Sequence, residues 1–212
     1  FYGHEPAFQP RPFPLSYPDE PDCRTFGEYG AGACLGACEK AGSQGAVVIQ
    51  MTWPGAPTLY YGDEAGVCGW TDPDSRRTYP WGKEDLELIE FHRYMTGIHK
   101  RIRAAQRRAE ASFCRTASDR YGRMSGDHQT ITVISNRPEP AVMEIPVWQL
   151  GITDDMILGR PILTFEDGYN AGIVFYRVEN GMLKVIMPPY GGAVFVSRPD
   201  GVLSGDRVAV CG

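Results

Sequence analysis

The sequence has no apolar run that approaches the ~20 residues needed to cross a bilayer, and it has no surplus of positive charge. Its 21 Lys and Arg stand against 26 Asp and Glu, which gives a formal net charge of -5. A chain with this charge has no general attraction for polyanions. We therefore expect neither nucleic acid nor a membrane as a partner.

Closely paired cysteines are also missing. The six cysteines contain no Cys-x-x-Cys pair, and Cys34 and Cys38 are not followed by the second pair that a structural zinc site needs. The glycines at 30–36 lack the preceding apolar strand and the following acidic residue of a dinucleotide site. We predict no metal and no other cofactor, and we expect the cysteines to be buried thiols in a cytoplasmic protein.

Glycine and proline are plentiful, at 25 and 17 residues, and proline is concentrated at the start of the chain. Each proline fixes φ and removes a backbone donor. We therefore expect residues 1–30 to be a Pro-rich arm that is extended or poorly ordered. Because Phe1 is not an initiator methionine, we also expect the chain to be truncated or excised. We predict a helix-strand-helix part over 31–110, a β domain over 111–200 and a tail over 201–212.

Helical and strand patterns alternate in the first of these parts. The glycine-rich segment 27–45 predicts only a weak helix before residue 46. Residues 57–61 form a short β-branched and aromatic run that is typical of a buried parallel strand. The clearest helix is predicted over 84–108, where apolar residues recur at three- and four-residue steps and acidic residues precede basic ones.

Beyond Gly122 the apolar period changes to two, which is typical of strands. Asn180 and Gly181 supply the positive-φ pair of a tight hairpin. These patterns predict a small antiparallel β-sandwich, and an α+β fold overall. The predicted strands are 130–134, 141–148, 173–178, 182–187 and 193–197.

The most specific stretch spans residues 50–64 and reads Gln-Met-Thr-Trp-Pro-Gly-Ala-Pro-Thr-Leu-Tyr-Tyr-Gly-Asp-Glu. Asp-Pro-Asp-Ser-Arg-Arg follows at 72–77, and Pro-Trp at 80–81. This pattern strongly resembles the α-amylase superfamily of glycoside hydrolases, particularly its neopullulanase-like and cyclomaltodextrinase-like members. The resemblance implies the last helix-strand-helix portion of a (β/α)8 barrel, namely helix seven, strand eight, its loop and helix eight. A small antiparallel β-sandwich would follow as the carboxyl-terminal domain.

A loop that follows the carboxyl end of a barrel strand lies on the active face of such a fold. This loop combines charged hydrogen-bonding groups with flat aromatic faces, which suits a sugar. We predict that the substrate-binding residues are Tyr61, Trp70, Asp72, Arg76, Arg77 and Trp81. By resemblance, Asp72 and Arg76 would hold a glucose unit near the cleavage point. The alternative is that these two residues form a salt bridge that only fixes the loop.

Asp63 and Glu64 do not fit a catalytic pair. Glycosidases place two carboxylates ~5 to 9.5 Å apart across the bond, whereas neighbours on a strand point to opposite faces. We interpret Gly62, Asp63 and Glu64 as a structural motif. The resemblance places the catalytic carboxylates on earlier strands, so we predict no catalytic residue here. We also expect His92 and His99 to be solvent-facing or helix-capping.

These observations predict that the chain is the carboxyl-terminal part of a glycoside hydrolase. The enzyme would act on α-glucosidic bonds of starch- or dextrin-type oligosaccharides. The chain would supply a sugar-contacting loop and be inactive alone, because a closed barrel takes ~250 residues and only about 110 precede the β domain. The alternative is a noncatalytic remnant or a weak carbohydrate-binding module. The expected partners are an α-glucan oligosaccharide and either the missing amino-terminal barrel portion or a second copy of the chain.

Overall fold

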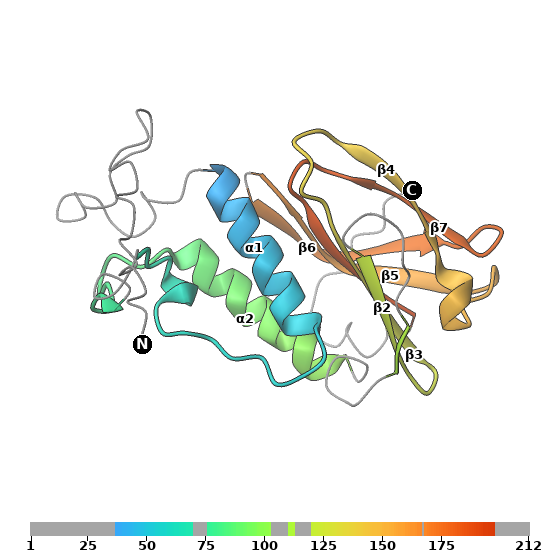
Figure 1. Ribbon diagram of the computed structural model, residues 1–212, viewed down its shortest axis with the longest axis horizontal. Helices are drawn as coiled ribbons and strands as arrows, with labels where there is room; N and C mark the ends of the chain where they lie inside the picture. Colours follow the sequence, from blue (N-terminus) through green and yellow to red (C-terminus); the bar gives the residue numbers. More distant parts are fainter. Residues whose placement is uncertain (1–36, 70–75, 103–109, 113–119, 167, 198–212) are drawn as a thin grey trace, which may run out of the picture.

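The structure is a computed structural model that describes residues 37–69, 76–102, 110–112, 120–166 and 168–197. The predicted arm over 1–30 and the tail over 201–212 lie outside these residues. Two α-helices, α1 (Ala37–Thr52) and α2 (Leu86–Arg101), lie side by side and on the same side of the strands (Figure 1). No helix among the described residues is long and apolar enough to cross a membrane.

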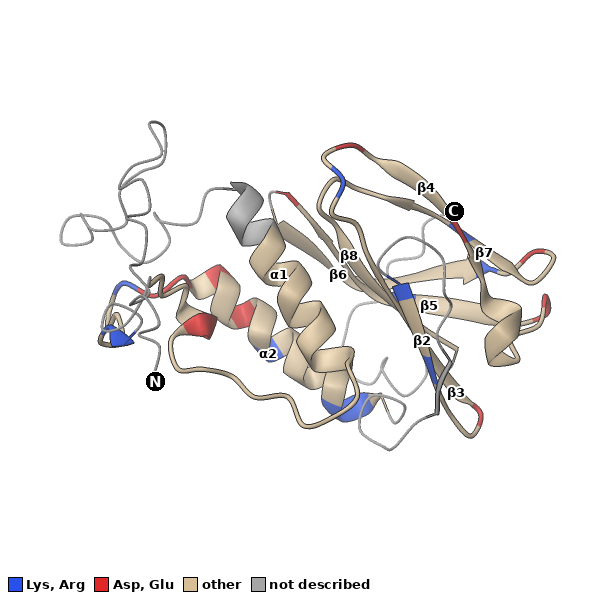
Figure 2. Ribbon diagram, viewed as in Figure 1, with Lys and Arg blue, Asp and Glu red and all other residues tan. Residues whose placement is uncertain are grey.

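Helix α2 begins at a capping side chain, whereas helix α1 begins in a glycine-rich segment. The side chain of Asp85 accepts a hydrogen bond from the Leu88 amide at 3.0 Å and caps the start of α2. Acidic residues lie near the start of α2 and basic residues in its last turn (Figure 2), in agreement with the helix dipole. Helix α1 begins at Ala37, so the part of the predicted weak helix from this residue to residue 46 is helical in the structure.

Eight strands in the described part of the chain form two antiparallel sheets. The larger sheet has the order β1 (Glu110–Ser112), β2 (Arg120–Ser125), β3 (His128–Ile134), β8 (Gly192–Val196), β5 (Ile157–Phe165) and β6 (Gly168–Arg177). The smaller sheet pairs β4 (Ala141–Pro146) with β7 (Met182–Met187), and the short 3-10 helix η5 (Val147–Leu150) follows β4. The prediction of an antiparallel β part that follows two helices is therefore confirmed.

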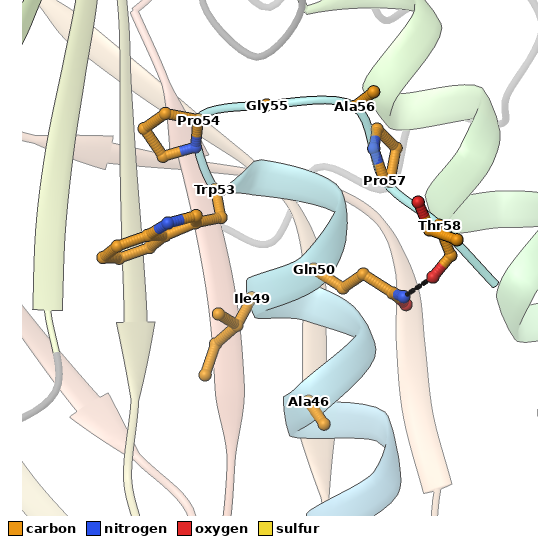
Figure 3. Close-up of a pocket in the computed structure, with 9 residues that line it drawn as sticks. All are labelled: Ala46, Ile49, Gln50, Trp53, Pro54, Gly55, Ala56, Pro57 and Thr58. Atoms are coloured by element: carbon orange, nitrogen blue, oxygen red, sulfur yellow. Dashed lines mark hydrogen bonds between the residues drawn. The ribbon is translucent and has the colours of Figure 1, made fainter. Parts of the chain in front are cut away.

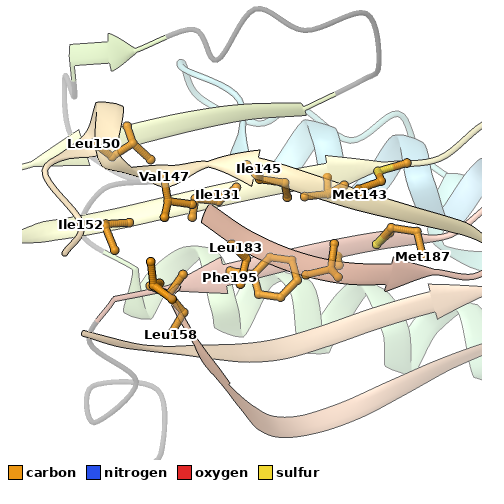
Figure 4. Close-up of a cluster of buried hydrophobic side chains, with 14 of the residues drawn as sticks. Ile131, Met143, Ile145, Val147, Leu150, Ile152, Leu158, Leu183, Met187 and Phe195 are labelled. Carbon is orange, nitrogen blue, oxygen red and sulfur yellow. The ribbon is translucent and has the colours of Figure 1, made fainter. Parts of the chain in front are cut away.

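The layers are helices, six-stranded sheet and two-stranded sheet, with apolar residues in both interfaces. Strand β8 shows how one strand serves both, because alternate residues point to opposite faces. Val194 and Val196 pack against the helices, whereas Ala193 and Phe195 pack against the small sheet (Figure 4). All five residues of β8 are buried. The large sheet thus has an apolar core on each face, one shared with the helices and one shared with the small sheet.

Asn180 and Gly181 form the predicted tight turn, with φ values of 52° and 71°. Glu179 and Met182 close it through two backbone hydrogen bonds, from the Glu179 amide to the Met182 carbonyl and the reverse. The flanking strands do not form a hairpin, however, because β6 pairs with β5 and β7 pairs with β4. The turn therefore passes the chain from the large sheet to the small one.

The prediction of a buried parallel strand over 57–61 is wrong. This segment is extended but belongs to no sheet, and Leu59 and Tyr60 are 41% and 51% exposed. No strand of the described residues runs beside it, so nothing accepts its ladder hydrogen bonds. The side-chain amide of Gln50 instead donates to the Thr58 carbonyl (Figure 3). The composition of residues 57–61 predicted a strand, but a β-strand forms only where a second strand pairs with it.

The carboxyl end of α1 is held by three side chains from other elements. His99 on α2 donates from Nδ1 to the Met51 carbonyl at 2.7 Å, and Arg123 on β2 donates from Nη1 to the Thr52 carbonyl at 3.0 Å. The hydroxyl of Tyr121 forms a hydrogen bond with that of Thr52. Terminal helix carbonyls have no partner within their own helix. These side chains supply the partners and join α1 to α2 and to β2, and the capping role expected for His99 is confirmed.

Candidate functional site

The chain from Tyr61 to the start of α2 carries all the predicted sugar-binding residues. The structure describes Tyr61, Arg76, Arg77 and Trp81. Trp70 and Asp72 lie outside the described residues. The predicted contact between Asp72 and Arg76 therefore stays a prediction, as does the salt-bridge alternative.

A tight turn after Tyr61 sets the start of this loop. Gly62 has φ 92°, and the Val67 amide donates back to its carbonyl at 3.0 Å. A Cβ added to Gly62 would lie 2.9 Å from a methyl group of Val67, so no larger residue fits without movement. The Glu64 carboxylate accepts a hydrogen bond from the Gly62 amide at 3.0 Å. Glu64 is thus engaged in holding its own turn.

Asp63 and Glu64 lie on a 3-10 helix, η3 (Asp63–Ala65), and not on a strand end. Burial raises the pKa of the Asp63 carboxyl, and the charge of Glu64 raises it further, while a bond to the Tyr60 backbone and the imidazole of His92 lower it.

His92 on α2 is buried, at 4% exposure, so the expectation that it faces solvent is wrong. Its Nδ1 lies 2.8 Å from the Leu88 carbonyl, which can only accept, so Nδ1 carries the proton. His92, Asp63 and Gln50 contribute to a hollow of about 360 Å³ between α1, η3 and α2. Sequence spacing could not reveal this burial, because η3 covers the histidine from outside the helix.

Two aromatic pairs lie at the two ends of the loop. The rings of Tyr60 and Tyr61 are 4.8 Å apart, and those of Tyr79 and Trp81 are 4.6 Å apart. Trp81 is 81% exposed. The Tyr61 hydroxyl donates to the Arg77 carbonyl at 2.8 Å, which joins the beginning of the loop to its return. Exposed aromatic faces of this kind can stack on the apolar face of a sugar ring.

Arg76 is exposed, and its charge acts on Tyr61. Partial burial raises the pKa of Tyr61, and Tyr60 raises it further, whereas the positive charge of Arg76 lowers it. The guanidinium group of Arg76 lies at the surface of the loop. It offers up to five N–H donors to ligand oxygens.

A second hollow of about 540 Å³ lies between α1 and the segment 54–58 (Figure 3). Ile49, Trp53, Pro54 and Pro57 line it, so its wall is mainly apolar. Sequence reasoning did not identify this hollow, because it exists only where the chain after α1 turns back along the helix.

No group of three or more potential metal ligands exists among the described residues. The described thiol, Cys68, forms no disulfide and is half-buried. Cys23, Cys34, Cys114 and Cys211 lie outside the described residues, as does the glycine pattern at 30–36.

No protein-family model matches the chain. Several curated proteins are similar to it. Among them, an amylopullulanase of Thermoanaerobacterium thermosulfurigenes is 32% identical over 72% of this chain, and neopullulanase 2 of Thermoactinomyces vulgaris is 29% identical over 70% of it. The chain spans 8% and 24% of these two proteins. Among solved structures, an α-amylase of Geobacillus thermoleovorans in complex with acarbose superposes with a TM-score of 0.62, at 18% identity, over 79% of this chain and 36% of that one.

The fold of two helices and an antiparallel β domain is thus that of the carboxyl-terminal portion of a glycoside hydrolase. The chain belongs to the α-amylase superfamily, in which its relatives include amylopullulanases and neopullulanases. The resemblance carried by residues 50–81 is confirmed.

Proposed function

We propose that this chain contributes the sugar-contacting loop and the β domain of a glycoside hydrolase that acts on α-glucosidic bonds of starch- or dextrin-type oligosaccharides. The observation that carries the proposal is the pair of aromatic platforms around the loop, on which Trp81 and Arg76 are exposed. The relatives, an amylopullulanase and a neopullulanase, are named for the same substrate class.

The arrangement also supports a finer assignment of the barrel elements. We assign α1 as the seventh barrel helix and α2 as the eighth. The segment 56–61, which belongs to no sheet in the described residues, would form the eighth strand only when a neighbouring strand pairs with it. The apolar residues Leu59, Tyr60 and Tyr61 are exposed. A strand with uncovered apolar side chains and unpaired backbone favours association with a further strand. The partner would be the amino-terminal part of the barrel or, failing that, a second copy of the chain.

The chemistry assigned to this chain is binding and not bond cleavage. Trp81 and Tyr79 would stack on a pyranose ring, and Arg76 would donate hydrogen bonds to its hydroxyls. Asp63 and Glu64 sit on one turn, and Glu64 is bonded to Gly62. By resemblance to the family, hydrolysis would be a retaining double displacement whose two carboxylates come from outside this chain.

Two measurements test the proposal. The purified chain is first incubated with maltooligosaccharides, cyclodextrin and pullulan while reducing ends are followed. We expect no turnover, and robust turnover by this chain alone would overturn the assignment of the catalytic carboxylates.

The loop itself is tested in the complete enzyme that would contain this chain. We expect Arg76→Ala to lower kcat/KM at least tenfold, about 1.4 kcal/mol, because it removes hydrogen bonds to the bound sugar. Lys83→Ala is the matched control, since Lys83 is also exposed on the loop. Unchanged kinetics in Arg76→Ala would favour the alternative that Arg76 only fixes the loop.

The alternative function is a noncatalytic remnant or weak carbohydrate-binding module. The extended, uncovered segment 56–60 is compatible with a chain that stands alone. Such a chain would bind oligosaccharides without association with a barrel portion, and its mass in solution would be that of a monomer at every concentration.

A further inference from the structure

Trp148 is a large apolar side chain that the core does not use. It lies on η5, where the neighbouring residues Val147 and Leu150 are buried in the core between the two sheets (Figure 4). Trp148 itself is 60% exposed. Val147 and Leu150 therefore attach η5 to the core, and the indole of Trp148 lies on the solvent side of η5.

The base of the indole lies against a second turn, at Gly181. The Trp148 amide donates to the Gly181 carbonyl at 3.2 Å, and the Gly151 amide donates to the Trp148 carbonyl at 3.0 Å. A Cβ added to Gly181 would lie 3.0 Å from the Cβ and 3.1 Å from the Cδ1 of Trp148. Gly181 thus leaves the space that the base of the indole occupies. A rigid aromatic ring loses little freedom when a ligand stacks on it.

A carboxylate fixes the turn on which Trp148 rests. Asp154 accepts hydrogen bonds from the amides of Asn180 and Gly181, at 2.9 Å and 2.7 Å. Asp154 and the indole therefore contact the same residue, Gly181. Each carboxylate oxygen can accept a second hydrogen bond, and the exposed side chain of Asn180 can both donate and accept. An apolar ring bordered by such groups matches a neutral sugar, which has an apolar face and hydroxyl edges.

We propose that Trp148, with Asp154 and Asn180, forms a second carbohydrate-binding platform for an α-glucan chain. The choice of an α-glucan rests on the proposed function. The platform is separate from the sugar-contacting loop, because η5 and the loop lie at opposite ends of the molecule (Figure 1). One polymer molecule could then be held at the β domain while another part of it lies at the loop.

A second protein molecule fits this surface less well than a sugar. The nearest exposed apolar pair on the small sheet is Val142 with Ile186, and the ion pair of Glu144 with Lys184, at 3.7 Å, lies between that pair and the end that leads to Trp148. The apolar surface is therefore interrupted. A stable protein interface buries more than about 1,000 Å², whereas stacking on a sugar needs one ring.

The experiment is affinity electrophoresis of the full chain in native gels that contain soluble starch or pullulan, with maltoheptaose as competitor. Four chains are compared: wild type, Trp148→Ala, Trp148→Phe and Trp81→Ala. We expect Trp148→Ala to weaken starch binding roughly two- to tenfold, the range of one aromatic stacking contact. Trp148→Phe keeps a flat ring and should retain most of the binding. Thermal melts show that each variant is folded.

The Trp81→Ala variant distinguishes this proposal from the proposed role of the sugar-contacting loop. If the loop proposal fails, Trp81→Ala binds as wild type while Trp148→Ala still loses affinity. If the platform proposal fails, Trp148→Ala binds starch as wild type does, or the wild-type chain shows no retardation at all. A fall in solution mass on Trp148→Ala without sugar would identify a contact between two copies and would also overturn the proposal.

Discussion

Arg123 offers the sharpest test of what joins the helices to the β domain. It is 1% exposed, and its Nη1 donates to the Thr52 carbonyl at the end of α1. A hydrogen bond from a charged donor contributes ~1.5 to 3 kcal/mol, and a cation at a helix carboxyl end adds ~0.3 to 1 kcal/mol. Burial also lowers the pKa of the guanidinium, so its desolvation offsets part of that gain.

We therefore expect Arg123→Met to reduce the free energy of unfolding by about 2 kcal/mol, because methionine fills similar space but leaves the Thr52 carbonyl without this donor. The assay is urea unfolding followed by circular dichroism, with amide exchange of Trp53, whose amide donates to the Ile49 carbonyl at 2.7 Å. Arg120→Met, on the same strand but half exposed, is the control and should change stability by less than about 1 kcal/mol. A variant Arg123→Met that is as stable as wild type would show that desolvation of the charge cancels its hydrogen bond.

Two further predictions concern the turn and the pH dependence. Gly62→Ala should destabilise by about 2 to 3 kcal/mol, because it adds a close contact with Val67 to the cost of a positive φ; Gly82→Ala, with φ 77° and open space around it, should cost only about 1 kcal/mol, and equal losses in urea unfolding would contradict the contact. Burial raises the pKa of Tyr121 above its ordinary value of 10.0, so the folded chain binds this proton more tightly than the unfolded chain. The unfolding free energy should therefore fall as pH rises above about 10, and Tyr121→Phe should remove that part of the fall; an unchanged pH profile would count against it.

Local patterns determined most of the secondary structure. Five predicted strands fall on β3, β4, β6, β7 and β8, and α2 follows from its apolar spacing and the capping Asp85. Strands β1, β2 and β5 were not predicted. Strand β5 contains Pro161 at a register irregularity, and β2 carries the charged Arg123 in its interior. Proline and buried charge both argue against a strand in a sequence pattern. In the structure, the register irregularity of β5 accommodates Pro161, and the Thr52 carbonyl at the end of α1 accepts a hydrogen bond from Arg123.

The sequence by itself determined the family and the chemical type of the loop, because the run from Gln50 to Trp81 combines a particular order of glycine, tyrosine, carboxylate and arginine. Only the tertiary structure decided which sheet each strand joins, that the segment 57–61 stands uncovered, that His92 is buried and that Trp148 is held outside the core. The physical reason is that periodicity reports which face of an element is apolar, whereas burial depends on which other element covers that face. That partner lies far away in the sequence: β2 holds the end of α1 through Arg123, and the Gly181 turn supports Trp148.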